Sequence, residues 1–129
     1  MALSLKFCRQ QRLHRAEDFA SLRGTRARVD GIHSFLKYGF LAREDQAPPL
    51  ARIAMVVGKK IGPSCFRHRL KRLMREAFRQ HQHELPSGID LLWVARRDIP
   101  AQWEWIHREF QSFVEWLQPL SQEERQTGN

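Results

Sequence analysis

Two groups of residues in the sequence have types and spacings that could do chemistry, and each lacks the partners that a reaction needs. Glu17 and Asp18 are adjacent carboxylates of the kind that hold divalent cations, but no third ligand lies nearby in sequence. Cys65 and His68 have the i, i+3 spacing of a thiol beside a base, yet no orienting residue or oxyanion donor accompanies them. We therefore interpret the carboxylates as helix-start acids and Cys65 as a buried thiol.

The remaining candidates are incomplete in a similar way. His81 and His83 are two residues apart, so on a helix their side chains point about 200° apart and cannot share a metal ion. The run Gly58-Lys59-Lys60 lacks the upstream glycine of a phosphate-binding loop. We therefore expect no catalytic side chain, and no metal ion or cofactor bound by the protein alone.

The stretch 59–79 carries the strongest chemical signal, and that signal indicates binding. It holds eight Lys or Arg residues against one Glu, a net charge of +7 in a chain whose total is +8. Like charges along one helix repel each other, and Glu76 alone can offset little of that repulsion. A polyanion would supply the missing negative charge, so nucleic acid is the leading partner class.

Helical periodicity divides this stretch into two faces. The apolar face has the spacing of a stripe that packs on a core, and consists of Phe66, Leu70, Leu73, Met74 and Ala77. The opposite face is cationic, and consists of Arg67, His68, Lys71, Arg72, Arg75 and Arg79, with Arg69 at its margin. The helix is expected to begin with Ser64 as N-cap or Pro63 as first helical residue, and to stop before Leu85-Pro86-Ser87-Gly88.

The elements around this helix are predicted from periodicity and turn residues. A short helix is expected over 14–23, ended by Gly24, and a core-covering helix over 102–117. Strands are expected over 31–42, with a division around Gly39 as an alternative, and over 51–57 and 89–95. The apolar run 51–57 favours a central strand that pairs with the strand before it. In the first strand, alternation places Ile32, Leu36, Tyr38 and Phe40 on one face and Phe35 on the other.

The 129 residues are enough for one core, so we predict a single domain, 1–129, with a mobile arm over about 1–12 and a frayed tail over about 118–129. The tail and the elements before it are acidic: residues 80–129 hold four bases and eight acids. We therefore expect the basic side of the protein to bind a polyanion, and the acidic C-terminal part to lie away from it. Two cysteines suggest no disulfide framework, and no run has the length or composition of a signal peptide or membrane span, so we expect a cytoplasmic protein.

A resemblance to a known family rests on the run 57–79, which reads V-G-K-K-I-G-P-S-C-F-R-H-R-L-K-R-L-M-R-E-A-F-R. It resembles the signature of the bacterial ribonuclease P protein component, V-S-K-K-x-G followed by a helix with R-N-R-x-K-R-x-x-R-E-x-F. Other family marks follow in order over about 12–115: Arg12, Leu13 and Phe19 of the opening, Phe35 and Tyr38 of the first strand, and the closing A-R at Ala95 and Arg96. Three positions depart from the pattern: His68 replaces Asn, Gly58 replaces Ser, and Arg23 replaces a second aromatic residue.

The resemblance implies an α/β (α+β) two-layer sandwich of order α-β-β-β-α-β-α, with a left-handed β-α-β crossover. It also implies an RNA-dependent endoribonuclease in which a catalytic RNA, using Mg²⁺, removes the 5′ leader of precursor tRNA, and in which the protein alone is a monomer. Contacts to the catalytic RNA would come from Lys59, Lys60, Arg67, His68, Arg69, Lys71, Arg72 and Arg75. The leader would stack in a cleft formed by Phe19, Phe35 and Tyr38.

Two other functions fit the charge. A non-catalytic ribosomal-RNA-binding protein would have the same basic helix and a similar fold. A duplex-DNA regulator would place the helix in the major groove, but the sequence has no helix-turn-helix partner and no dimerisation heptads. A preference for duplex DNA over structured RNA at matched salt would favour that regulator.

Overall fold

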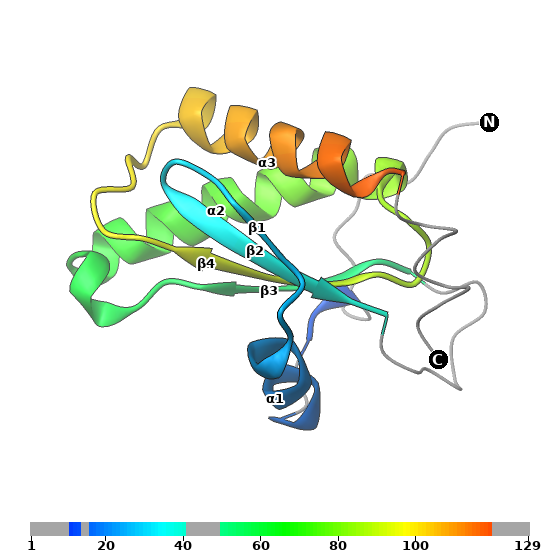
Figure 1. Ribbon diagram of the computed structural model, residues 1–129. Helices are drawn as coiled ribbons and strands as arrows, with labels where there is room; N and C mark the ends of the chain where they lie inside the picture. Colours follow the sequence, from blue (N-terminus) through cyan, green and yellow to red (C-terminus); the bar gives the residue numbers. More distant parts are fainter. Residues whose placement is uncertain (1–10, 14–15, 41–49, 120–129) are drawn as a thin grey trace.

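The computed structural model describes residues 11–13, 16–40 and 50–119 (Figure 1). In chain order the elements are α1 (Ala16–Gly24), β1 (Arg28–Asp30), β2 (Ser34–Gly39), β3 (Arg52–Val56), η2 (Lys59–Ile61), α2 (Ser64–His81), η3 (Gln82–Glu84), β4 (Asp90–Ala95) and α3 (Trp103–Leu117). Apart from the two short 3-10 turns, this is the predicted order α-β-β-β-α-β-α. The mixed α/β fold is confirmed.

The sheet separates two layers of unequal size, as Figure 1 shows. Helices α2 and α3 cover one face, where the larger core contains Leu36, Ile53, Leu91 and Trp93. Helix α1 covers part of the other face, where a smaller cluster contains Leu13, Leu22, Ala54 and Leu92. Strands β3 and β4 contribute alternate residues to both clusters, which is why their sequences are nearly continuous apolar runs.

The sheet order is β1-β2-β4-β3, so the predicted pairing of the second and third strands is wrong. Strand β3 runs parallel to β4, which inserts between β3 and β2. A parallel pair requires a crossover, and α2 supplies it by returning the chain over the sheet. Strand β3 is therefore an edge strand rather than a central one.

The segment 11–13 covers the open edge of β3. The backbone N–H of Leu13 donates to the carbonyl oxygen of Ile53 at 3.2 Å, and Arg12 forms a parallel bridge with the same residue. Gln11 is buried and hydrogen-bonded to Gln82. The predicted arm is thus too long, because its last two residues belong to the fold.

The strand predicted over 31–42 begins only at Ser34, after a turn at residues 31–33, and residues 41–42 lie outside the described residues. Strand β1 precedes this turn and pairs Val29 with Leu36; periodicity did not predict it, although the family order includes a third strand before the basic helix. Ile32, expected on the core face, is 77% exposed in the turn. Leu36 and Tyr38 are buried as alternation requires.

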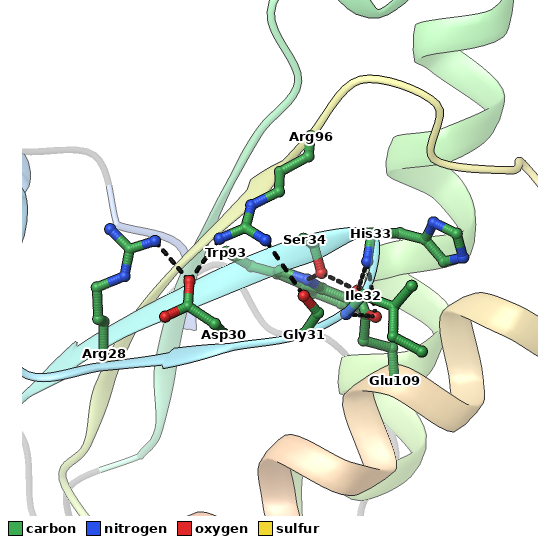
Figure 2. Close-up of polar contacts among 9 residues, drawn as sticks. All are labelled: Arg28, Asp30, Gly31, Ile32, His33, Ser34, Trp93, Arg96 and Glu109. Atoms are coloured by element: carbon green, nitrogen blue, oxygen red, sulfur yellow. Dashed lines mark hydrogen bonds and ion pairs between the residues drawn. The ribbon is translucent and has the colours of Figure 1, made fainter.

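Glu109 of α3 fixes this turn (Figure 2). Its carboxylate accepts hydrogen bonds from the backbone N–H of Ile32 at 2.7 Å and of His33 at 3.0 Å, and from the hydroxyl of Ser34. The indole N–H of Trp93 donates to the same hydroxyl at 2.8 Å. A Cβ on Gly31 would lie 2.6 Å from the Glu109 carboxyl carbon, so any other residue there would displace the carboxylate from these hydrogen bonds.

The two long helices form where they were predicted, but both predicted starts of α2 are wrong by one residue: Pro63 is the N-cap, and Ser64 is the first helical residue. Leu70, Met74 and Ala77 are buried, and Phe78, which the predicted stripe omitted, is fully buried. On α3 the predicted stripe packs on the core: Ile106, Phe110, Phe113, Val114 and Leu117 are buried, and Trp103 is half-buried.

Candidate nucleic-acid interface

The cationic face of α2 faces solvent. Six of the predicted RNA-binding side chains are exposed: Lys59 and Lys60 in η2, and His68, Arg69, Lys71 and Arg72 on α2. The other two, Arg67 and Arg75, are half-buried. Within the described residues, none of these eight side chains forms an ion pair with an acid. Arg67 instead donates from Nε to the carbonyl oxygen of Gly62 at 3.1 Å, which ties the helix to the loop before it.

Among the residues that the structure describes, Glu76, the one acidic residue of α2, pairs with Arg79 and with none of these eight side chains. Glu76 accepts from Nε of Arg79 at 2.9 Å and from Nε2 of Gln80 at 3.2 Å. The hydrogen bond from Arg79 is the main reason why the pKa of Glu76 lies below its ordinary value, and the same bond raises the pKa of Arg79. The positive charge between Arg67 and Arg75 is therefore left for an external anion.

Two hollows adjoin this face and share His68. The first, of about 500 Å³, is lined by Ser64, Cys65, His68, Arg69 and Arg72. The second, of about 360 Å³, lies between α2 and the sheet and is lined by Arg12, Leu13, Phe19, Ile53, Ala54, Met55, His68, Lys71 and Arg75. The second hollow joins Phe19 of α1 to the cationic helix.

Phe35 lies on the same side of the sheet as α1. It is paired with Val94, which packs against the smaller cluster together with Phe19. The guanidinium carbons of Arg28 and Arg96 lie 4.1 Å and 5.4 Å from the centroid of its ring. Phe35 is therefore a half-buried aromatic platform with cations on it.

Tyr38 is not part of this surface, so the structure does not bring the three predicted cleft residues together. It is 6% exposed in the larger core, and its ring centroid lies 5.5 Å from that of Trp116. Residues three apart on a strand point to opposite faces, so Phe35 and Tyr38 could not share one cleft. The motif F-x-x-Y groups them in sequence only.

The structure adds cationic residues that sequence reasoning missed. Arg28 lies opposite Lys37 in the β1–β2 register, and Lys37 follows Phe35 by two residues on the same face. Asp30 forms ion pairs with both Arg28 and Arg96, as Figure 2 shows, and so fixes the two guanidinium groups that lie on the ring of Phe35. The hydrogen bond from Arg28, opposed by desolvation and aided by Arg96, lowers the pKa of Asp30. Strand alternation around Phe35 was the signal that could have identified Lys37.

Arg23, which departs from the family pattern, lies beside the aromatic ring of Phe19. Its guanidinium carbon lies 5.9 Å from the ring centroid of Phe19. A cationic contact therefore stands where the family pattern has a second aromatic residue. Phe19 and Phe35 thus each carry at least one guanidinium group.

The groups first considered for catalysis have other surroundings. Asp18 lies 3.5 Å from Arg52, and Cys65 is exposed rather than buried, at the first hollow. His81 contacts His107 of α3. No set of three or more His, Cys, Asp or Glu side chains suited to a metal ion occurs in the described ranges.

A mixed α/β sandwich that combines a single-sign helix face with an aromatic and cationic sheet face defines a nucleic-acid-binding protein. The family model described as Ribonuclease P matches residues 7–118. The chain therefore belongs to the ribonuclease P protein family, and it is a subunit of the ribonuclease that processes tRNA.

Curated relatives support this membership. The ribonuclease P protein component of Oleidesulfovibrio alaskensis is 34% identical over 91 residues, which cover 70% of each chain. That of Brevibacillus brevis is 37% identical over 95 residues, covering 72% of this chain and 71% of the relative. Neither the ribosomal-RNA-binding protein nor the DNA regulator is favoured by these matches.

Solved structures agree on the fold. The ribonuclease P protein of Thermotoga maritima superposes with a TM-score of 0.67 at 20% identity, covering 81% of this chain and 96% of that one. The protein of Staphylococcus aureus gives a TM-score of 0.66 at 19% identity, covering 82% and 94%. In the part of the chain that the structure describes, no helix is both long and apolar enough to cross a bilayer.

Proposed function

We propose that the cationic face of α2 docks the catalytic RNA of ribonuclease P, and that the α1 side of the sheet receives the 5′ leader of precursor tRNA. The observation that carries the first part is the unpaired single-sign charge of α2 within the described residues. Arg69 and Arg72 are its centre, because both are exposed and line one hollow. Phosphate contacts at such a face bind RNA without reading its sequence.

The second hollow supports the leader part of the proposal. It places the aromatic ring of Phe19 beside Lys71 and Arg75, so a strand could stack on the ring while its phosphates meet the helix. Phe35, flanked by Arg28 and Arg96, offers a second platform on the same side of the sheet. His68 borders both hollows, and so stands where the docked RNA and the leader would meet.

In this proposal the protein binds and orients, and the RNA performs the hydrolysis with Mg²⁺. Mg²⁺ prefers oxygen ligands such as carboxylates, and the described residues gather no cluster of three acids or other metal-binding side chains that would hold it. We assign Mg²⁺ to the RNA, whose phosphate oxygens are ligands of the kind that this ion prefers. The protein alone is proposed to be a monomer that works in the cytoplasm, where precursor tRNA is made.

Reconstitution tests the proposed function. The purified chain is mixed with ribonuclease P RNA, and cleavage of precursor tRNA is followed at low Mg²⁺. The chain is expected to raise the cleavage rate above that of the RNA alone, because it supplies positive charge that Mg²⁺ would otherwise have to provide. No gain in rate at any protein concentration would refute the proposal.

Replacing Phe19 or Phe35 with alanine is expected to impair substrates with a long leader more than leaderless substrates. Stacking of one base on an aromatic ring contributes about 1 to 3 kcal/mol, or about 5- to 150-fold in affinity. The measurement is the KM of the reconstituted enzyme for both substrates. Trp116→Ala is the matched control, because Trp116 is 46% exposed but lies on α3, in the layer across the sheet. Equal losses with both substrates would indicate a folding defect.

A further inference from the structure

Two histidines from different helices meet at the end of α2. His81 is the last residue of α2, and its Nε2 lies 2.8 Å from Nε2 of His107 in α3. The centroids of the two imidazole rings are 4.9 Å apart. Each ring therefore directs the same nitrogen at the other.

Neighbouring side chains hold both rings in place. Glu84 of η3 is hydrogen-bonded to Nδ1 of His81. A proton on that Nδ1 leaves the lone pair of Nε2 directed at His107. Trp103 stacks on His107, with ring centroids 4.8 Å apart and planes inclined by 25°. A carboxylate on the far nitrogen of a histidine is the usual support of a metal-binding imidazole.

We propose that His81 and His107 bind a first-row divalent cation that favours imidazole, with Zn²⁺ as the representative ion. Tetrahedral Zn²⁺ with bonds of about 2.0 to 2.1 Å holds two ligand nitrogens about 3.3 Å apart. The two Nε2 atoms must therefore separate by about 0.5 Å, and both rings must turn so that their lone pairs converge on the ion instead of on each other. Water fills the other positions, because the described residues offer no third side-chain ligand there.

Zn²⁺ binding requires that neither Nε2 atom carry a hydrogen. In the apo pair one Nε2 carries the hydrogen that the other accepts, and with Glu84 on His81 that hydrogen belongs to His107. On binding, the hydrogen moves from Nε2 to Nδ1 of His107 through solvent, so both rings stay neutral.

This site differs from the expectation that the protein alone binds no metal, and it is separate from the RNA face. A cation shared by α2 and α3 would fix the C-terminal end of the helix whose other turns carry the cationic face. Mg²⁺ is a hard cation that prefers oxygen ligands, so the Mg²⁺ of the holoenzyme would not compete for two imidazoles.

The test is calorimetric titration of Zn²⁺ into the full chain, prepared without a histidine tag and freed of metal with EDTA. The parent is expected to bind one Zn²⁺ per chain, with affinity at least tenfold lower in H81Q and in H107Q. Two control variants are expected to bind as the parent does: H83Q removes an exposed histidine two residues from His81, and C65S removes the exposed thiol.

Glu84→Gln adds a graded readout. It keeps both ligands and is expected to weaken Zn²⁺ binding about 10- to 100-fold, as loss of a supporting carboxylate does. Melting curves in EDTA establish that each variant is folded before titration. Undiminished binding in H107Q, loss of binding in C65S, or no binding by the folded parent would each overturn the proposal.

Discussion

Replacing Arg69 and Arg72 together with glutamine is expected to weaken binding to ribonuclease P RNA and to flatten its dependence on salt. Both side chains are exposed at one hollow of α2. Each lost phosphate contact removes about 0.7 to 0.9 from the slope of log K against log salt concentration, so the double variant should lose about 1.4 to 1.8. The affinity gap between parent and variant should narrow about tenfold between 50 and 200 mM salt.

A double variant of Arg97 and Arg108 to glutamine is the matched control. It removes the same charge from exposed positions outside α2, one after β4 and one on α3. Filter binding or fluorescence anisotropy over a salt series gives both slopes. An equal loss in the control would mean that net charge matters and position does not, and an unchanged slope in the first variant would place the RNA elsewhere.

The basic helix could be predicted in detail because its information is local. Helical periodicity alone separates apolar from cationic residues, and the buried Leu70, Met74 and Ala77 follow from it. The predicted apolar stripe was too narrow to include Phe78. Because α2 packs against both the sheet and α3, its buried face is wider than that of a helix with one neighbour.

Strand order could not be predicted because both arrangements satisfy the same pattern. The apolar run of β3 fits a central strand, and equally an edge strand whose faces are covered and whose edge pairs with segment 11–13. The strand order is determined by β4, which inserts between β2 and β3 after the crossover through α2. That contact joins residues far apart in sequence, and periodicity carries no information on it.

The predicted leader cleft of Phe19, Phe35 and Tyr38 conflicted with strand alternation, which the sequence already showed. Alternation along β2 already assigned Phe35 and Tyr38 to opposite faces, while the motif F-x-x-Y assigned them to one cleft. In the structure Tyr38 lies in the larger core, on the face opposite Phe35. The side chains beside the ring of Phe35 are those of Arg28 and Arg96. A motif states which residues recur, but strand geometry decides which of them can meet.

Asp18 and Asp90 could not be placed from sequence, because their partner Arg52 belongs to an element distant from both. Arg52 donates from Nε to Asp90 Oδ1 at 2.7 Å and from a terminal nitrogen to Oδ2 at 3.1 Å. A terminal nitrogen of Arg52 also lies 3.5 Å from Asp18 of α1. One guanidinium group thus joins α1, β3 and β4 below the surface.

Replacing Arg52 with methionine is expected to lower the free energy of unfolding by about 3 to 5 kcal/mol. Asp90 is fully buried, so the variant would leave a carboxylate without its bidentate partner in a site of low dielectric. Methionine keeps much of the side-chain volume, which separates the loss of charge from the creation of a cavity. Urea unfolding of the protein alone, followed by circular dichroism, measures the change.

Two further variants identify the cause. Asp18→Asn should cost about 1 kcal/mol or less, because Asp18 is partly exposed and makes the longer contact. Combining Arg52→Met with Asp90→Leu should recover much of the loss, since replacing both members of a buried ion pair removes the uncompensated charge. If the double variant is no more stable than Arg52→Met alone, the stabilising role of Arg52 does not lie in neutralising Asp90.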